Sequence, residues 1–170
     1  MTSETLTEIA TTEREAQSHL TDVFRVCVAS GCLASSSDSL KQALEKEVVA
    51  RQLSGRCQVK GVGCLGLCSE GPLVSTGSGT LYHRVKVSDV QEIVDHVGRE
   101  AVPRISLPTN TPFFQKQTKI VLENSGVVDP ERIEDYIAAG GYSPLLHVLQ
   151  EMTPAQVIQE VTKSGLRGRG

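Results

Sequence analysis

The sequence lacks any apolar run that could cross a membrane, since no stretch approaches the roughly 20 apolar residues that a spanning helix needs. It also lacks a basic excess, because its formal net charge is −3 and it offers no positive field for nucleic acid or anionic lipid. An apolar secretion signal is missing too, since the first residues include Glu4, Glu8, Glu13 and Glu15. We therefore expect a cytoplasmic protein without nucleic-acid binding or membrane insertion, one that reaches a membrane face only through a complex.

An even number of cysteines, which a disulfide framework would need, is also missing. The chain has five cysteines, and in a reducing compartment thiols in this number more often bind a metal than pair as disulfides. Cys57 lies inside a predicted strand without a partner at ligand spacing, so we expect it to be a small core residue. Metal ligation is the leading interpretation for the other four.

These four cysteines form two pairs. Cys27 and Cys32 lie in CVASGC, Cys64 and Cys68 lie in GVGCLGLCSEGP, and 31 residues separate the two pairs. Four soft thiolates suit either tetrahedral zinc or an iron–sulfur cluster. The spacing favours the cluster, because structural zinc pairs usually follow a C-x2-C pattern and neither pair here does.

Glycines surround the second pair. Gly63, Gly66 and Gly71 should let this segment curl tightly, because glycine alone takes left-handed dihedrals without steric cost. A cluster also favours small residues and backbone N–H groups around its sulfurs, which these glycines supply. We interpret the segment as a metal-binding loop.

Histidine is absent from both cysteine segments. The four histidines, His19, His83, His96 and His147, are scattered over predicted helices and a strand. A Rieske-type site with two histidines is therefore disfavoured, and no set of residues in the chain supports hydrolysis.

Hydrophobic periodicity predicts an α/β module in the order βαβββα, preceded by a short amphipathic helix. Capping boxes at Thr5–Glu8 and Ser88–Gln91 are expected to begin the first and last of its helices. In chain order we expect a helix at 5–20, a strand at 24–29, a helix at 38–53, a strand at 57–62, a hairpin around Gly77–Gly79 and a helix from 88 to 97.

A second unit follows a linker. Residues 99–111 hold two prolines and little periodicity, which indicates a connecting segment. Three helices should then begin at Asp129-Pro130, Ser143-Pro144 and Thr153-Pro154, each with a capping residue followed by proline at the first helical position. Gly140 and Gly165 supply stops, and the three apolar stripes should pack together.

The pattern CVASGC with CLGLCSEGP resembles the thioredoxin-like [2Fe-2S] ferredoxin family, which includes the small ferredoxin subunit of the NADH dehydrogenase module of respiratory complex I. The resemblance covers roughly residues 23–98 and implies a thioredoxin-like fold. It also implies that the cluster ligands are Cys27, Cys32, Cys64 and Cys68. The C-x-x-C redox motif is absent, so a dithiol exchange enzyme is not expected although the fold would be shared.

The second unit resembles another protein of the same module. DPERIEDYIAAGGYSPLLHVL and MTPAQVIQEVTKSGLRGRG are similar to the start of its flavoprotein subunit, which binds FMN and NADH. The resemblance implies that Gly165, Arg167, Gly168, Arg169 and Gly170 form the first part of an FMN loop, where glycine N–H groups and arginine charge face a phosphate. We expect the rest of the flavin site to lie outside this sequence.

A ferredoxin-like domain joined to such a start resembles diaphorase subunits, for example the flavin subunit of NAD-reducing bidirectional hydrogenases. We therefore expect an N-terminal helix at 1–22, a ferredoxin domain at 23–98, a linker at 99–111 and the truncated start of a flavoprotein domain at 112–170. Electrons would pass between NAD(P)H, FMN, a [2Fe-2S] cluster and partner iron–sulfur and hydrogenase-type subunits. The alternative is a zinc-stabilised adaptor whose helical tail binds a partner.

Overall fold

The computed structural model describes residues 2–168 and shows a five-stranded mixed sheet in the order β2-β1-β3-β4-β5. The first two strands are parallel and the others are antiparallel. This is the α/β fold that the sequence predicts. The strands are β1 (Asp22–Cys27), β2 (Cys57–Val62), β3 (Val74–Ser75), β4 (Leu81–Tyr82) and β5 (Ser106–Leu107).

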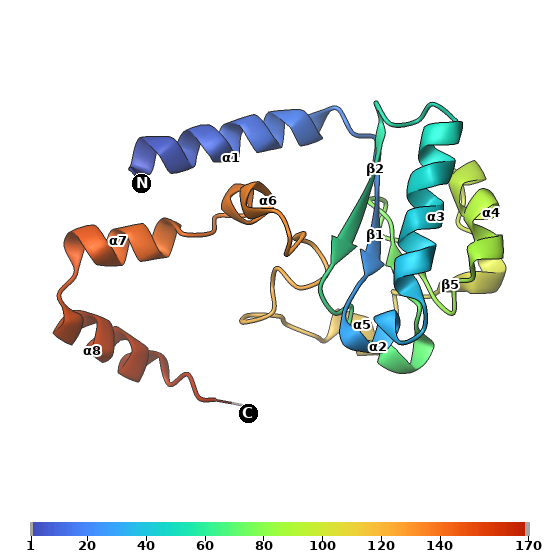
Figure 1. The fold of residues 1–170 in the computed structure, drawn as a ribbon. Helices are drawn as coiled ribbons and strands as arrows, with labels where there is room; N and C mark the ends of the chain where they lie inside the picture. Colours follow the sequence, from blue (N-terminus) through green and yellow to red (C-terminus); the bar gives the residue numbers. More distant parts are fainter. Residues whose placement is uncertain (1, 169–170) are drawn as a thin grey trace.

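Helices α3 (Ser37–Ala50) and α4 (Val90–Asp95) lie together beside the sheet (Figure 1). Helix α3 connects the parallel strands β1 and β2, as a crossover helix must. Phe24 of β1, Leu44 of α3 and Ile93 of α4 are each at most 1% exposed and form the main core with neighbouring apolar residues. The helix-covered side of the sheet therefore holds most of the hydrophobic stabilisation.

The remaining helical segments are short or lie outside this core. The sequence did not predict the 3-10 turns. The segments are α1 (Ser3–Ser18), α2 (Ser30–Leu33), η1 (Cys68–Glu70), η2 (Val87–Asp89), η3 (Pro103–Ile105), α5 (Pro112–Gln115), α6 (Ile133–Ala138), α7 (Ser143–Glu151) and α8 (Pro154–Ser164). Within the described residues no helix is long and apolar enough to cross a membrane.

Helix α1 begins earlier than predicted. Thr2 is its N-cap, and the Thr2 hydroxyl accepts a hydrogen bond of 3.2 Å from the backbone N–H of Thr5. The predicted capping box of Thr5 with Glu8 is therefore wrong, because a threonine three residues upstream satisfies the first free N–H groups.

Helix α4 also starts differently. The backbone N–H of Lys86 donates to the Asp89 carboxylate at 2.8 Å, and the chain enters α4 through the 3-10 turn η2. The predicted capping box of Ser88 with Gln91 is wrong. The Asp89 carboxylate instead closes the turn η2 and accepts from Arg104 at 2.9 Å, and Asp89 precedes α4 without a side-chain cap hydrogen bond to it.

Residues 99–111, expected to be a linker, contribute to the sheet. Leu107 of β5 pairs with Leu81 of β4, and the backbone N–H of His83 donates to the Ile105 carbonyl at 2.9 Å. Val102 and Ile105 are buried in the main core. A strand of two residues between prolines shows no alternation, so periodicity cannot reveal it. The sheet therefore extends past residue 98.

The C-terminal helices follow the predictions in part. Thr153 caps α8 as expected, and the turn closes with a 2.8 Å hydrogen bond from the Thr153 N–H to the Gln156 side chain. Helix α7 starts at Ser143, with Tyr142 as its N-cap. Helix α6 starts later than predicted, because the Asp129 carboxylate accepts from the Glu131 N–H at 2.9 Å and closes a turn instead of a helix.

The three C-terminal helices do not pack together as expected. They follow one another in an open row (Figure 1), and among the described residues α7 and α8 have no buried side chain. Instead α6 packs on α1, where Ile137 is 3% exposed and contacts a small apolar cluster with Leu6 and Ala10. An apolar stripe predicts burial but does not specify which helix covers it.

A buried ion pair ties α6 to the sheet. The Lys60 ammonium of β2 lies 2.6 Å from the Asp135 carboxylate of α6, and both side chains are less than 10% exposed. Asp135 also accepts from the Gln17 side chain at 2.7 Å and from the Asp129 N–H at 2.8 Å. Burial would raise the pKa of Asp135, but these hydrogen bonds and the Lys60 charge outweigh it and hold the pKa below its ordinary value.

A second pair joins α1 to the same helix region. Arg132 donates two hydrogen bonds to the Glu13 carboxylate, at 2.9 and 2.8 Å. Arg14 donates to the Ala138 carbonyl at 2.7 and 3.0 Å. We call these contacts, together with Lys60–Asp135, the polar clamp. The clamp fixes α1 and α6 to each other and to β2.

We predict that Asp135→Asn lowers the free energy of unfolding by about 3–5 kcal/mol, because it leaves the Lys60 charge buried without a partner. Urea denaturation monitored by circular dichroism measures this. Since the folded pKa of Asp135 is depressed, the stabilisation is complete at neutral pH and is lost as the pH falls through that pKa.

The matched control is Glu45→Gln, which removes the more exposed Lys41–Glu45 pair on α3 and should cost less than about 1 kcal/mol. Equal effects of the two substitutions would contradict the role assigned to the clamp.

Candidate metal centre

The two predicted cysteine pairs meet at one end of the sheet. Cys27 is the last residue of β1, and Cys64 follows β2 after a single glycine. The strands are parallel with Cys27 opposite Val62, so both chains leave the sheet at the same edge. Cys32 lies on the one-turn helix α2, which the sequence did not predict, and Cys68 begins the turn η1.

The two segments are in contact with each other. A Cβ atom added at Gly31 would lie 3.5 Å from the Cys68 sulfur, and one added at Gly71 would lie 3.0 Å from the Cys32 sulfur. Cys57 lies apart from them in the main core, as predicted. The structure thus brings together the four candidate ligands and separates the fifth cysteine.

The pairs differ in burial. Cys27 and Cys32 are each 1% exposed and form an apolar cluster with Leu73, whereas Cys64 and Cys68 are exposed. A group bound by all four would therefore be shielded on one side and close to solvent on the other. Such a position protects the group and leaves one edge accessible to a partner.

The environment favours the protonated thiols when no cation is present. Burial, followed by interaction with Cys27, raises the pKa of Cys32 to about 11. Interaction with the Cys64 side chain is the main cause that raises the pKa of Cys68. A bound metal cation reverses this preference, because it deprotonates the thiols that coordinate it.

The glycines of the second segment have different roles. Gly66 has φ +90° and its backbone N–H donates to the Cys64 sulfur at 3.3 Å, so the expected left-handed glycine is confirmed there. Gly63 and Gly71 do not have positive φ, and the expectation that all three are left-handed is wrong. Gly71 is needed instead for its missing side chain, because the Cys32 sulfur occupies that space.

The arrangement of the thiols can be compared with the needs of the two candidate metal groups. Zinc would take all four thiolates around one point. In a [2Fe-2S] cluster each iron takes two thiolates, and the chain provides two thiol pairs on facing segments.

Residues 13–98 match the sequence pattern of the thioredoxin-like [2Fe-2S] ferredoxins. The chain belongs to this family. It is 34% identical over 79 residues to the 2Fe-2S ferredoxin of Clostridium pasteurianum, a match that covers 45% of this chain and 78% of that ferredoxin. The ferredoxin fold and electron transfer through a [2Fe-2S] cluster are properties of the family.

Two further likenesses concern a longer protein and a solved structure. Subunit HndC of the NADP-reducing hydrogenase of Solidesulfovibrio fructosivorans is 55% identical over 60 residues, which are 35% of this chain but only 12% of the subunit. The crystal structure of the thioredoxin-like [2Fe-2S] ferredoxin from Aquifex aeolicus has 28% identity and a TM-score of 0.48, and the match covers 51% of this chain and 96% of that one.

A polar contact that sequence reasoning missed holds the turn that carries Cys68 against the ferredoxin sheet. The Glu70 carboxylate lies 2.8 Å from His83 Nδ1 and 2.9 Å from Arg84 Nε, and the Arg84 N–H donates to the Glu70 carbonyl at 2.8 Å. His83 and then Arg84 lower the pKa of Glu70. No local pattern marks Glu70, because its partners are 13 and 14 residues away.

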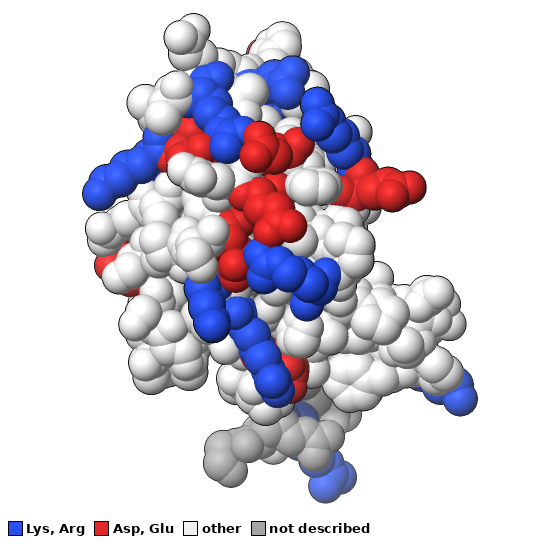
Figure 2. Space-filling model, turned by 90° about the vertical axis from the view of Figure 1, so that its right-hand side faces the viewer, with Lys and Arg blue, Asp and Glu red and all other residues white. Residues whose placement is uncertain are grey.

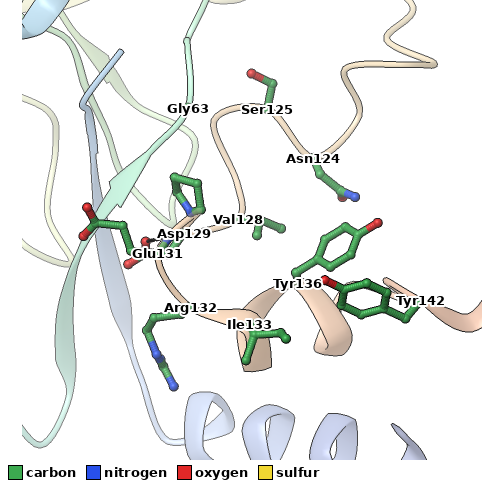
Figure 3. Close-up of a pocket in the computed structure, with 11 residues that line it drawn as sticks. Gly63, Asn124, Ser125, Val128, Asp129, Glu131, Arg132, Ile133, Tyr136 and Tyr142 are labelled. Atoms are coloured by element: carbon green, nitrogen blue, oxygen red, sulfur yellow. Dashed lines mark hydrogen bonds between the residues drawn. The ribbon is translucent and has the colours of Figure 1, made fainter. Parts of the chain in front are cut away.

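A second missed contact comes from beyond the ferredoxin region. The Ser125 hydroxyl donates to the Cys64 carbonyl at 2.9 Å. Gly126 is buried with φ +81°, and a Cβ atom there would lie 2.5 Å from the Leu65 side chain. Figure 3 shows Ser125 near Gly63, at one end of a cavity of about 490 Å³ that Tyr136 and Tyr142 line at the other. The C-terminal segment thus contacts the cysteine loop directly.

The predicted FMN loop is not assembled with the cysteines. Gly165 ends α8 with φ +67°, and Arg167 and Gly168 are exposed beyond it. The chain after α8 runs well apart from α2 (Figure 1). Arg169 and Gly170 lie outside the described residues.

We predict that Gly66→Ala destabilises the protein by about 1–2 kcal/mol, because a Cβ atom is disfavoured at positive φ. Open space surrounds this position, so a steric clash does not contribute. The free energy of unfolding from urea denaturation measures the effect.

Gly55→Ala is the matched control, since it also has open space and its φ is not positive. It should be neutral or stabilise by up to about 1 kcal/mol. A similar loss in both variants would argue against the conformational explanation.

Proposed function

We propose that this chain carries a [2Fe-2S] cluster on Cys27, Cys32, Cys64 and Cys68 and transfers electrons through it. The observation that supports this most directly is the pairing of a buried thiol pair with an exposed one at the end of the parallel strands. The bound cluster would accept and release one electron at a time.

The protein's own groups would protect and tune this site. The apolar cluster of Cys27, Cys32 and Leu73 excludes water from the inner side. The Gly66 N–H donates to the Cys64 sulfur. This hydrogen bond would favour the reduced form of a bound cluster, which carries one more negative charge than the oxidised form. The contact of Glu70 with His83 and Arg84 holds the turn of Cys68 in place.

We further propose that the chain corresponds to the start of a diaphorase-type flavin subunit, with a helix at 1–22, a ferredoxin domain from 23 that includes β5, and a flavoprotein start from 112. The identity to the NADP-reducing hydrogenase subunit HndC supports this. FMN and NAD(P) would then bind in the longer protein, with Gly165, Arg167 and Gly168 among the first residues of the FMN loop. Iron–sulfur and hydrogenase-type subunits would be its partners.

The cluster assignment predicts two iron atoms and two acid-labile sulfides for each chain purified without oxygen. Dithionite reduction should produce the EPR signal of a single reduced [2Fe-2S] centre. Zinc without sulfide would overturn the proposal and would favour the zinc-stabilised adaptor, whose fold should be lost on chelation.

Serine substitutions test the ligands one by one. Cys27→Ser, Cys32→Ser, Cys64→Ser and Cys68→Ser should each lower the iron content or alter the EPR signal, because a hydroxyl is a harder and poorer iron ligand. Cys57→Ser is the matched control. A variant series in which Cys57→Ser loses the cluster and the four others keep it would refute the ligand assignment.

A further inference from the structure

A cavity of about 610 Å³ opens beside the exposed cysteine pair. Cys64 and Leu67 line it on the side of the ferredoxin domain, and Phe113, Phe114 and Leu122 line it on the side of the C-terminal segment. Its size falls within the range of binding pockets, about 300–1,000 Å³. One wall of the cavity belongs to the C-terminal segment and lies outside the residues matched to the family. The opposite wall contains Cys64, a proposed cluster ligand.

The C-terminal wall of this cavity exposes apolar side chains. Phe113 is 57% exposed and Leu122 is 64% exposed, and the ring of Phe113 meets that of Phe114 edge to face with centroids 5.1 Å apart. Aromatic side chains in such positions are typical of the centres of protein interfaces. Apolar area of this kind beside a redox site indicates a surface that a partner covers.

The same wall carries positive charge without acidic partners. Residues 105–122 contain Lys116 and Lys119 and no acidic residue. Lys119 lines the cavity, and Lys116 is the C-cap of α5, which carries both phenylalanines. In the part of the chain that the structure describes, neither lysine forms an ion pair with a side chain, although Glu123 follows in the sequence.

On other parts of the surface, several basic side chains pair with acidic ones. Basic and acidic side chains lie interspersed on the face that Figure 2 shows. Arg51 pairs with Glu47 and Asp95, and Arg104 pairs with Asp89 and Glu92. On the other side of the cysteine loop, Arg84 and His83 hold the Glu70 carboxylate. Lys116 and Lys119 have no such partner among the described residues, and their charges can attract an external negative charge.

We propose that this cavity is the docking surface for an acidic redox protein that exchanges one electron with the cluster. Its acidic rim pairs with Lys116 and Lys119, and one of its apolar side chains enters between Phe113 and Leu122. Docking there places the partner's one-electron cofactor near Cys64, the exposed edge of the site. This inference rests on the proposed function, because it specifies which face of the cluster site the partner contacts.

The test uses the full 170-residue chain and purified flavodoxin, an acidic protein whose FMN takes one electron at a time, as the probe. Isothermal titration at low ionic strength gives the dissociation constant, and stopped-flow absorbance gives the rate of electron transfer from the dithionite-reduced chain. Lys116→Glu with Lys119→Glu should weaken binding and slow transfer about tenfold or more, and about 0.5 M salt should remove the difference from wild type.

The matched control reverses two exposed basic residues that line neither this cavity nor its neighbour, Lys46→Glu with Arg99→Glu, and so makes the same change in net charge. This control should change the dissociation constant and the rate of electron transfer by less than about twofold. A third variant, Phe113→Ser, should weaken flavodoxin binding several-fold without changing the salt dependence, because it removes apolar contact and no charge.

Four outcomes would overturn the proposal. The first is an equal effect of the two charge reversals, and the second is no binding of flavodoxin. The third is binding of basic cytochrome c that is as tight as that of flavodoxin or tighter. The fourth is a dimer of the wild-type chain that Phe113→Ser dissociates, because this would assign the surface to a second copy. Iron and sulfide content, measured on the same samples, separates failure of docking from failure of the cluster assignment.

Discussion

The parallel pairing of β1 with β2 is the constraint on which the rest of the site depends. Its register sets Cys27 opposite Val62, so the chain leaves both strands at one edge, and Cys27 and Cys64, which are 37 positions apart in sequence, come to lie there. Antiparallel pairing would send the two loops to opposite edges. Helix α3 makes the parallel arrangement possible as the crossover, and its apolar stripe forms the core against which both strands are held.

The sequence predicted the parts of the site that have local signatures. Two spaced cysteine pairs, the strand at 57–62 and the core role of Cys57 could be recognised from spacing and alternation, and the structure agrees with each. The contact of Ser125 with the Cys64 carbonyl could not, because it joins residues 61 positions apart and leaves no periodic trace. The contact of Glu70 with Arg84 could not be recognised either, because these residues are 14 positions apart and no local pattern joins them.

The residues that cap each helix and the helices that pack together could be predicted only in part from local sequence patterns. Thr153 was recognised as a cap, but Thr2 replaced the expected cap of α1 and Asp89 closes the turn η2 before α4, because several polar residues compete near each start. Apolar stripes showed which faces seek burial. The choice of α1 as the partner of α6 depends on the polar clamp, whose charges lie more than 70 residues apart.

The position of β2 at one border of the sheet has a further consequence. A six-residue border strand offers unpaired backbone groups to any other extended chain, and proteins commonly guard such borders with lysine or with a covering segment. Here Lys60 of β2 is buried and paired with Asp135, so its role is to fasten α6 to the border strand. The segment that carries α6 is thereby held against β2, where a packed segment disfavours the pairing of the strand with another extended chain.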